Sequence, residues 1–141
     1  MGYYLVLDKY HLEQLYSHAE NCKPEEAVAL LFGIVENSNI VVKNVALVEN
    51  SARSRTTFSV EPTLQYQLLV EAENRGESLV CIFHSHPAPP RPSSKDLKNM
   101  ELNPVVWLIA SKESGEWESQ AFVLSGKKIE NVSVIISDEA L

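Results

Sequence analysis

Two histidines and an aspartate in the middle of the chain are candidates for a metal site. His84 and His86 stand two residues apart, directly after the apolar run Leu79–Phe83. In an extended chain such side chains point to the same side, so both imidazoles can reach one ion while Ser85 points away. Asp96 would supply a third ligand and leave the fourth tetrahedral position to water, as in catalytic zinc sites. We therefore expect one Zn²⁺ per chain.

A metal that activates water for hydrolysis needs a carboxylate nearby to move protons. Such a group takes the proton of the water and later hands it to the leaving amine. Glu26, which precedes the apolar run Ala27–Gly33, is the candidate for this role. Its structural alternative is a helix cap or a salt-bridge carboxylate. The chemistry predicted for the whole set is hydrolysis of an amide or isopeptide bond.

A serine beside the third ligand is a candidate for stabilising the reaction's oxyanion. Ser93 lies three residues before Asp96, so a turn that brings Asp96 to the metal also brings this hydroxyl close to the developing charge. As an alternative, Ser93 and Ser94 can cap the helix that Asp96 enters. A serine nucleophile is disfavoured, because no separate histidine and aspartate remain for a triad once both motif histidines bind metal.

The elements that must hold these residues follow from the hydrophobic pattern. Short apolar and alternating runs predict strands, and apolar residues at helical spacing predict helices. Gly76 is a plausible stop for the second helix. The sum is a mixed α/β domain built around one sheet. Strands are expected at about 3–7, 25–33, 40–48, 79–83, 105–110, 117–124 and 132–136, and helices at 9–22, 63–75 and 96–100.

Composition and charge narrow the class of protein. A chain of 141 residues with 45% hydrophobic and 22% charged residues predicts one globular domain, residues 1–141. The formal charge of −7 argues against nucleic acid as a partner. No apolar run approaches the roughly 20 residues that cross a bilayer, so we expect a cytoplasmic protein without a membrane partner. Cys22 and Cys81 show no CxxC pairing, which favours reduced thiols, with one bridge between them left open.

The motif residues resemble the JAMM, or MPN-plus, family of zinc isopeptidases. Phe83-His84-Ser85-His86-Pro87 followed by Arg91-Pro92-Ser93 and Asp96 matches the family's HxHP...SxxD pattern. The upstream stretch from Pro24 to Gly33 is similar to the family's P-x-E segment that ends in Leu-Leu-x-Gly, and this alignment selects Glu26 over Glu25. Further positions that resemble the family's middle section are Asn50, Phe58, Val60 and Pro62.

This resemblance implies a fold and an activity. The expected fold is a single MPN domain, similar to cytidine deaminases, with a curved mixed sheet flanked by helices. Its zinc would be held by His84, His86 and Asp96, with Glu26 as the catalytic carboxylate and Ser93 stabilising the tetrahedral intermediate. The expected substrates are conjugates of ubiquitin or a ubiquitin-like protein. The compact length resembles prokaryotic and archaeal members, and the likeness to the proteasomal lid deubiquitinase suggests a proteasome-like assembly as a further partner.

One departure concerns the loop that leads to the third ligand. Pro87–Pro92 separates His86 from Ser93, one residue fewer than is usual in the family. Its prolines can absorb the difference because they restrict the paths of the chain. Alternatively the shorter loop shifts Asp96 or makes Ser94 the functional hydroxyl. We assign Ser93 because it preserves the SxxD spacing.

The segment from Asn50 to Ser59 matches the part of the family that lies beside the modifier's extended C-terminal tail. An added strand binds largely through main-chain bonds, with pockets for side chains. Candidate substrate-binding residues are Arg53, Arg55, Thr57 and Phe58, although a solvated loop is the favoured interpretation of the arginines. Two other functions stay open: a catalytically silent MPN scaffold that binds partner proteins, and a JAMM peptidase that trims a sulfur-carrier-like protein. A silent scaffold usually lacks a ligand or the glutamate, whereas this sequence keeps them.

Overall fold

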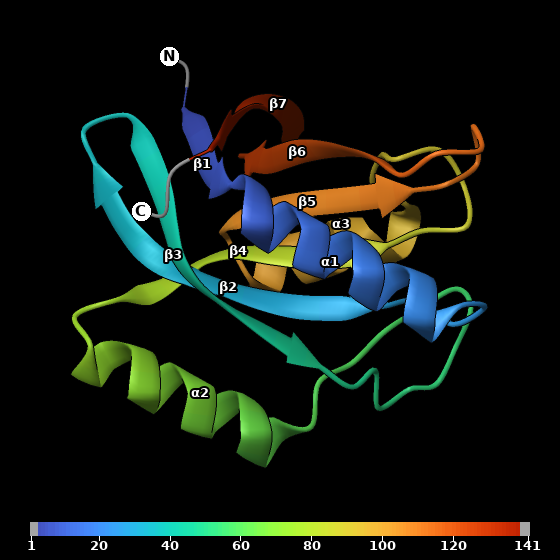
Figure 1. Ribbon diagram of the computed structural model, residues 1–141, viewed down its shortest axis with the longest axis horizontal. Coiled ribbons are helices and arrows are strands. Elements are labelled where there is room, and N and C mark those ends of the chain that lie inside the picture. Colours follow the sequence, from blue (N-terminus) through green and yellow to red (C-terminus); the bar gives the residue numbers. More distant parts are fainter. Residues whose placement is uncertain (1–2, 139–141) are drawn as a thin grey trace.

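A curved β-sheet that closes into a barrel forms the centre of the molecule (Figure 1). The computed structural model describes residues 3–138. Within them the strands are β1 (Tyr4–Asp8), β2 (Val28–Glu36), β3 (Asn39–Val48), β4 (Ser78–Ser85), β5 (Val106–Ser111), β6 (Glu118–Ser125) and β7 (Lys128–Ser137), and the helices are α1 (Lys9–Cys22), α2 (Pro62–Asn74) and α3 (Ser94–Leu102).

The strand order explains how the barrel closes. The order around the sheet is β1-β3-β2-β4-β5-β6-β7, and β1 pairs in parallel with both β3 and β7. The β4–β5 pair is also parallel, and the other neighbours are antiparallel. The predicted class, a mixed α/β fold with a curved sheet flanked by helices, is therefore confirmed. Closure of the sheet into a barrel was not predicted.

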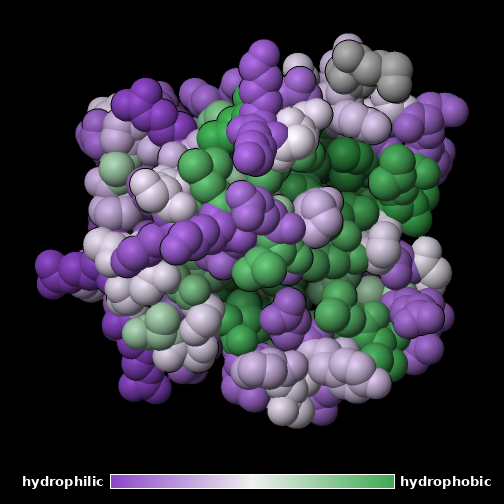
Figure 2. Space-filling view, turned by 180° about the vertical axis from the view of Figure 1, so that it is seen from behind, coloured by the Kyte–Doolittle hydropathy of each residue, from purple (hydrophilic) through white to green (hydrophobic). Residues whose placement is uncertain are grey.

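The helices cover opposite faces of the sheet. Successive residues of a strand point to opposite faces, so β2 sends Ala29 and Leu31 toward α1 and Leu30 and Phe32 toward α2 and α3. In Figure 1, α1 lies in front of the sheet and α3 behind it. Figure 2 shows the face opposite α1, where apolar side chains gather in patches between hydrophilic ones. Residues that face α2 and α3 thus share a side with the candidate site on β4.

Capping residues fix where the helices begin and end. The Asp8 carboxylate accepts a hydrogen bond from the Tyr10 amide at 2.7 Å, and α1 has the predicted bounds. Gly76 has a φ of 77°, a left-handed conformation suited to glycine, and follows the end of α2 as predicted. The third helix begins at Ser94 instead of the expected residue 96, because Ser93 is its cap. No helix within residues 3–138 is long and apolar enough to span a membrane.

Both cysteines are free thiols. Cys81 is buried within β4, the strand that carries His84, and burial raises the pKa of its thiol. Cys22 is half-buried at the end of α1, and burial raises its pKa as well. The structure thus agrees with reduced thiols and leaves no bridge between these two residues.

Candidate active site

The end of β4 carries the two histidines of the motif. His84 is fully buried and lies between two strands, opposite Val28 of β2 and Ile109 of β5. The His86 amide donates a hydrogen bond to the Ala110 carbonyl at 2.8 Å, which extends the pairing with β5 beyond the end of β4. A side chain on a strand held from both sides has little freedom to move.

Two buried carboxylates flank the ring of His84. Glu26 Oε1 lies 3.3 Å from His84 Nδ1, and Asp96 Oδ1 lies 3.2 Å from His84 Nε2. The side chains of both acids are at most 5% exposed. The structure therefore brings together three of the predicted site residues, Glu26, His84 and Asp96, from the residues just before β2, the end of β4 and the first turn of α3.

Asp96 is held in place by a capping box. Its Oδ2 accepts a hydrogen bond from the Ser93 amide at 2.8 Å, and its own amide donates to Ser93 Oγ at 3.2 Å. One carboxylate oxygen thus serves the helix cap while the other faces His84. Ser93 is the cap, and Ser94 is the exposed first residue of α3. The shorter proline loop therefore still brings Asp96 to His84.

These contacts change the titration of both partners. Burial acts to lower the pKa of His84, but its contacts with Asp96 and Glu26 outweigh this and raise the pKa from 6.5 to about 9. Burial acts to raise the pKa of Asp96, but the contact with His84 and the bonds with Ser93 outweigh it and lower the pKa. The cluster therefore favours an ionised Asp96 beside a basic ring.

Two ring nitrogens at the site are buried and lack hydrogen-bond partners: His84 Nε2 and His86 Nδ1. Buried polar atoms normally have hydrogen-bond partners, so two buried nitrogens without one require an explanation. The 3.2 Å between His84 Nε2 and Asp96 Oδ1 is close to the about 3.4 Å expected for two atoms that share a tetrahedral zinc at about 2.0–2.2 Å each. These nitrogen and oxygen donors fit a metal that prefers histidine and carboxylate ligands.

His86 stands beside the pair without joining it. Its ring centroid lies 5.8 Å from that of His84, with the planes nearly perpendicular. Within residues 3–138, no three side chains of His, Cys, Asp or Glu converge closely enough to hold a metal ion. The structure thus assembles two of the three expected ligands, and binding by His86 stays a prediction.

Asn50, which the motif analysis left without a role, ties the backbone of Glu26 to the neighbouring segment. Its buried side chain donates to the carbonyls of Glu26 at 2.9 Å and Thr57 at 3.0 Å. Its Oδ1 accepts from the amides of Ala52 at 3.0 Å and Ser59 at 3.1 Å. A polar residue inside a polar stretch gives no periodic signal, so its burial was not predicted from the sequence.

The segment from Asn50 to Ser59 lies against the site. The Glu26 amide donates to the Ser54 carbonyl at 2.8 Å, so both backbone polar groups of Glu26 bond to this segment. The half-buried ring of Phe58 lies 5.0 Å from that of His84 and 5.8 Å from that of Trp107. Two of the four predicted substrate residues, Thr57 and Phe58, therefore support the site from this segment.

The two arginines of the segment are exposed. Arg53 pairs with Glu49 at 3.4 Å on the surface, a weak interaction in water. Arg55 lines a cavity of about 540 Å³ that also reaches Glu26 and His86. Arg55 therefore borders the same cavity as two of the predicted site residues.

The side chain of Ser85 points away from the histidines, as expected, and Ser85 bonds with the backbone of Ala27. Its Oγ accepts a hydrogen bond from the Ala27 amide at 2.8 Å, and its amide donates to the Ala27 carbonyl at 3.0 Å. These bonds join the end of β4 to the residue after Glu26. The position of Ser85 between two motif histidines was the only sequence signal for this role.

Comparison with known proteins gives the chain its family. The model of prokaryotic homologues of the JAB domain matches residues 8–123. A desampylase of Pyrococcus furiosus is 41% identical over 113 residues, which cover 79% of this chain and 76% of that protein. The solution structure of protein DSY2949 from Desulfitobacterium hafniense superposes with a TM-score of 0.84 at 28% identity, covering 96% of this chain and 94% of that one. Together with the retained motif, these matches show that the chain belongs to the prokaryotic branch of the JAB, or JAMM/MPN-plus, family.

Proposed function

We propose that this protein is a zinc-dependent isopeptidase that cuts the bond between the C-terminus of a ubiquitin-like modifier and its target. The observation that carries the proposal is the buried arrangement of Glu26, His84 and Asp96, together with two buried ring nitrogens, His84 Nε2 and His86 Nδ1, that have no hydrogen-bond partner. Membership of the JAB family adds support, since this arrangement stands at the family's motif residues.

Zinc is the metal that best suits the donors. His84 and His86 supply imidazole nitrogen and Asp96 supplies carboxylate oxygen, a set that leaves one tetrahedral position open. When bound, the zinc acts as a Lewis acid and lowers the pKa of water to about 7. Asp96 is ready for this role because its pKa is lowered and its second oxygen is fixed by the cap of α3.

Glu26 carries the proton. Hydrolysis adds the hydroxyl of water to the carbonyl carbon, breaks the carbon–nitrogen bond and gives the nitrogen a proton. Glu26 takes a proton from the attacking water and delivers it to the departing nitrogen, so it ends the cycle as it began. Its backbone is held on both sides by Asn50 and Ser54, which keeps its carboxylate at one position beside His84.

Ser93 stabilises the oxyanion. Its oxygen already accepts the Asp96 amide, which leaves the hydroxyl hydrogen free to donate. A donor aimed at the developing charge is worth about 100- to 1,000-fold in rate. The capping role and the catalytic role are compatible because they use different atoms of one hydroxyl.

The substrate is a conjugate of a small ubiquitin-like protein. The relative from P. furiosus is named a desampylase, and the likeness spans most of both chains. The extended tail of the modifier lies along the segment from Asn50 to Ser59, with main-chain bonds for affinity. Docking on a proteasome-like assembly and a cytoplasmic location remain predictions of the resemblance and the composition.

The test is cleavage of a ubiquitin-like modifier joined to a lysine, with zinc-loaded wild type, Glu26→Gln and Glu25→Gln. The wild type and Glu25→Gln are expected to release the modifier, and Glu26→Gln to be at least about 100-fold slower while retaining its zinc. Zinc-loaded wild type that cleaves no conjugate would favour the silent scaffold. Full activity of Glu26→Gln would remove this residue from the proton path.

A further inference from the structure

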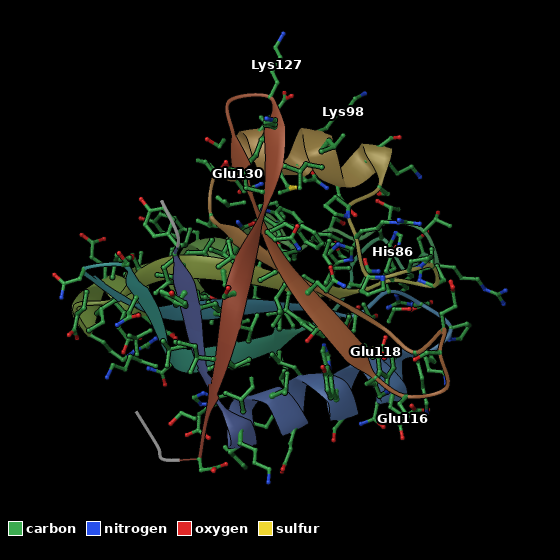
Figure 3. The ribbon with its side chains drawn as sticks, turned by 90° about the horizontal axis from the view of Figure 1, so that it is seen from above. His86, Lys98, Glu116, Glu118, Lys127 and Glu130 are labelled. Atoms are coloured by element: carbon green, nitrogen blue, oxygen red, sulfur yellow. The ribbon has the colours of Figure 1, made fainter. Side chains whose placement is uncertain are left out.

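A cavity of about 540 Å³ borders the candidate active site. Glu26 and His86 line it together with the apolar side chains of Pro24, Pro87 and Trp117. Its outer wall is the turn between β5 and β6, from Lys112 to Trp117. In Figure 3 the labelled His86, Glu116 and Glu118 lie on the same side of the molecule.

One acidic residue of α1 holds this wall in place. Glu20 Oε1 accepts hydrogen bonds from Lys112 Nζ at 2.8 Å and from Trp117 Nε1 at 3.0 Å. Its Oε2 accepts from Lys23 Nζ at 3.2 Å. These bonds lower the pKa of Glu20 to about 2, so its carboxylate stays ionised at neutral pH. The two ends of the β5–β6 turn are thus anchored to the end of α1.

Trp117 is fixed in orientation as well as in position. Its ring stacks on that of Tyr16, with centroids 6.1 Å apart and planes inclined by 22°. The Tyr16 hydroxyl in turn bonds with Ser119 Oγ at 2.8 Å. A half-buried aromatic ring that is held by a hydrogen bond on its edge and a second ring beside it presents a fixed apolar surface to the cavity.

Which part of the substrate enters this cavity depends on where the modifier tail binds. The segment from Asn50 to Ser59 follows β3, bonds with the backbone of Glu26 through Asn50 and Ser54, and leads to α2. A modifier tail that lies along this segment, as proposed above, would bring the scissile bond to Glu26. The atoms beyond the scissile bond must then enter the space past Glu26 and His86, which is the cavity.

From this geometry, and resting on the isopeptidase function above, we propose that the cavity is the subsite for the leaving side of the substrate and takes the aliphatic chain of the target lysine. Trp117, Pro24 and Pro87 pack against its methylene groups. Lys23 and Lys112 are paired with Glu20, and the lining also carries the cation Arg55 and the acids Glu25, Glu26 and Glu113. A volume of about 540 Å³ lies within the range of about 300–1,000 Å³ typical of ligand sites.

The first test uses wild-type protein and one modifier whose C-terminus carries methylamine, n-butylamine or a lysine side chain as its amide. Because one methylene in an apolar pocket is worth about tenfold or more, kcat/KM is expected to rise at least about tenfold from methylamine to n-butylamine. Equal values for these two substrates would overturn the subsite. No cleavage of any of the three would instead count against the proposed function.

The second test compares Trp117→Ala with Trp117→Phe and with Lys127→Ala, a matched control on the turn between β6 and β7, away from His86 in Figure 3. Trp117→Ala is expected to lower kcat/KM about tenfold for the lysine conjugate and at most about twofold for the methylamide. Trp117→Phe keeps an apolar ring and should retain most of the preference. An equal loss on both substrates in Trp117→Ala would overturn the proposal, because it would mark a structural role.

A binding experiment gives a readout that does not depend on turnover. The indole N–H resonances of Trp117 and the buried Trp107 are assigned with Trp117→Phe, and Nα-acetyl-lysine methylamide is then added to the wild type. Trp117 is expected to shift and Trp107 to stay. Movement of neither resonance at saturating concentrations of this compound would overturn the placement of the lysine chain.

Discussion

Replacing Asn50 by alanine tests whether its buried amide holds Glu26, the proposed proton carrier, in position. The substitution removes four hydrogen bonds of 2.9–3.1 Å, to the backbone of Glu26, Ala52, Thr57 and Ser59. At about 1 kcal/mol per bond the loss is about 4 kcal/mol, and about half of that where water replaces the amide. At about 3 °C per kcal/mol for a domain of this size, the melting temperature should fall by about 6–12 °C.

The same variant should lose activity while it is still folded. A displacement of about 1 Å at a reacting group costs up to about 100-fold in rate, so kcat on a modifier conjugate should fall steeply at 25 °C. The matched control is Asn44→Ala, whose exposed side chain bonds with Glu77 and whose loss should change stability by less than about 0.5 kcal/mol. Equal melting temperatures and equal kcat values for Asn50→Ala and Asn44→Ala would refute the reasoning.

Three further substitutions test contacts that hold the elements around the site in position. In Gly33→Ala the added Cβ would clash with the Val41 carbonyl oxygen, so urea unfolding should show a loss of about 3 kcal/mol or more, and an unchanged midpoint would contradict this. Phe58→Leu loses the ring contacts with His84 and Trp107 and should lower the free energy of unfolding by about 1–3 kcal/mol in the same assay. An unchanged free energy of unfolding would mean that these contacts do not stabilise the fold. The pKa of Glu20 is lowered from 4.5 to about 2 on folding, so its stabilising effect is present above pH 4.5 and is lost as the pH falls toward 2. The difference in melting temperature between wild type and Glu20→Gln should therefore close over that range, and a difference that persists at pH 2 would argue against the anchor.

Local patterns in the sequence were enough to place the elements that carry the chemistry. The helix at 9–22 has the predicted bounds, because its cap and its apolar spacing lie within the segment itself. The strand that delivers His84 and His86 is where its apolar run predicted it, extended by a residue or two at each end. The sequence also indicated that Ser93 or Ser94 could cap the helix that holds Asp96, and the structure shows that Ser93 is the cap.

Features that depend on distant parts of the chain were not predictable in this way. The barrel closes because β1 pairs with both β3 and β7, and no local pattern encodes partners that lie so far apart in the sequence. The polar stretch from Asn50 to Thr57 indicated a surface loop, which holds for Arg53 and Arg55, whereas Asn50 is buried because its amide satisfies four backbone groups. The wall formed by Lys112 and Trp117 likewise depends on Glu20, more than ninety residues upstream.

Zinc content tests the central claim most directly. The protein is purified without chelators or acid, and metal is measured in wild type, in Asp96→Ala and in Lys98→Ala, a control on the exposed face of the same helix. We predict about one zinc per chain in wild type and in Lys98→Ala, and little or none in Asp96→Ala, because a site that loses one of three protein ligands binds zinc far more weakly. Wild-type protein without zinc, or undiminished zinc in Asp96→Ala, would contradict a site formed by His84, His86 and Asp96.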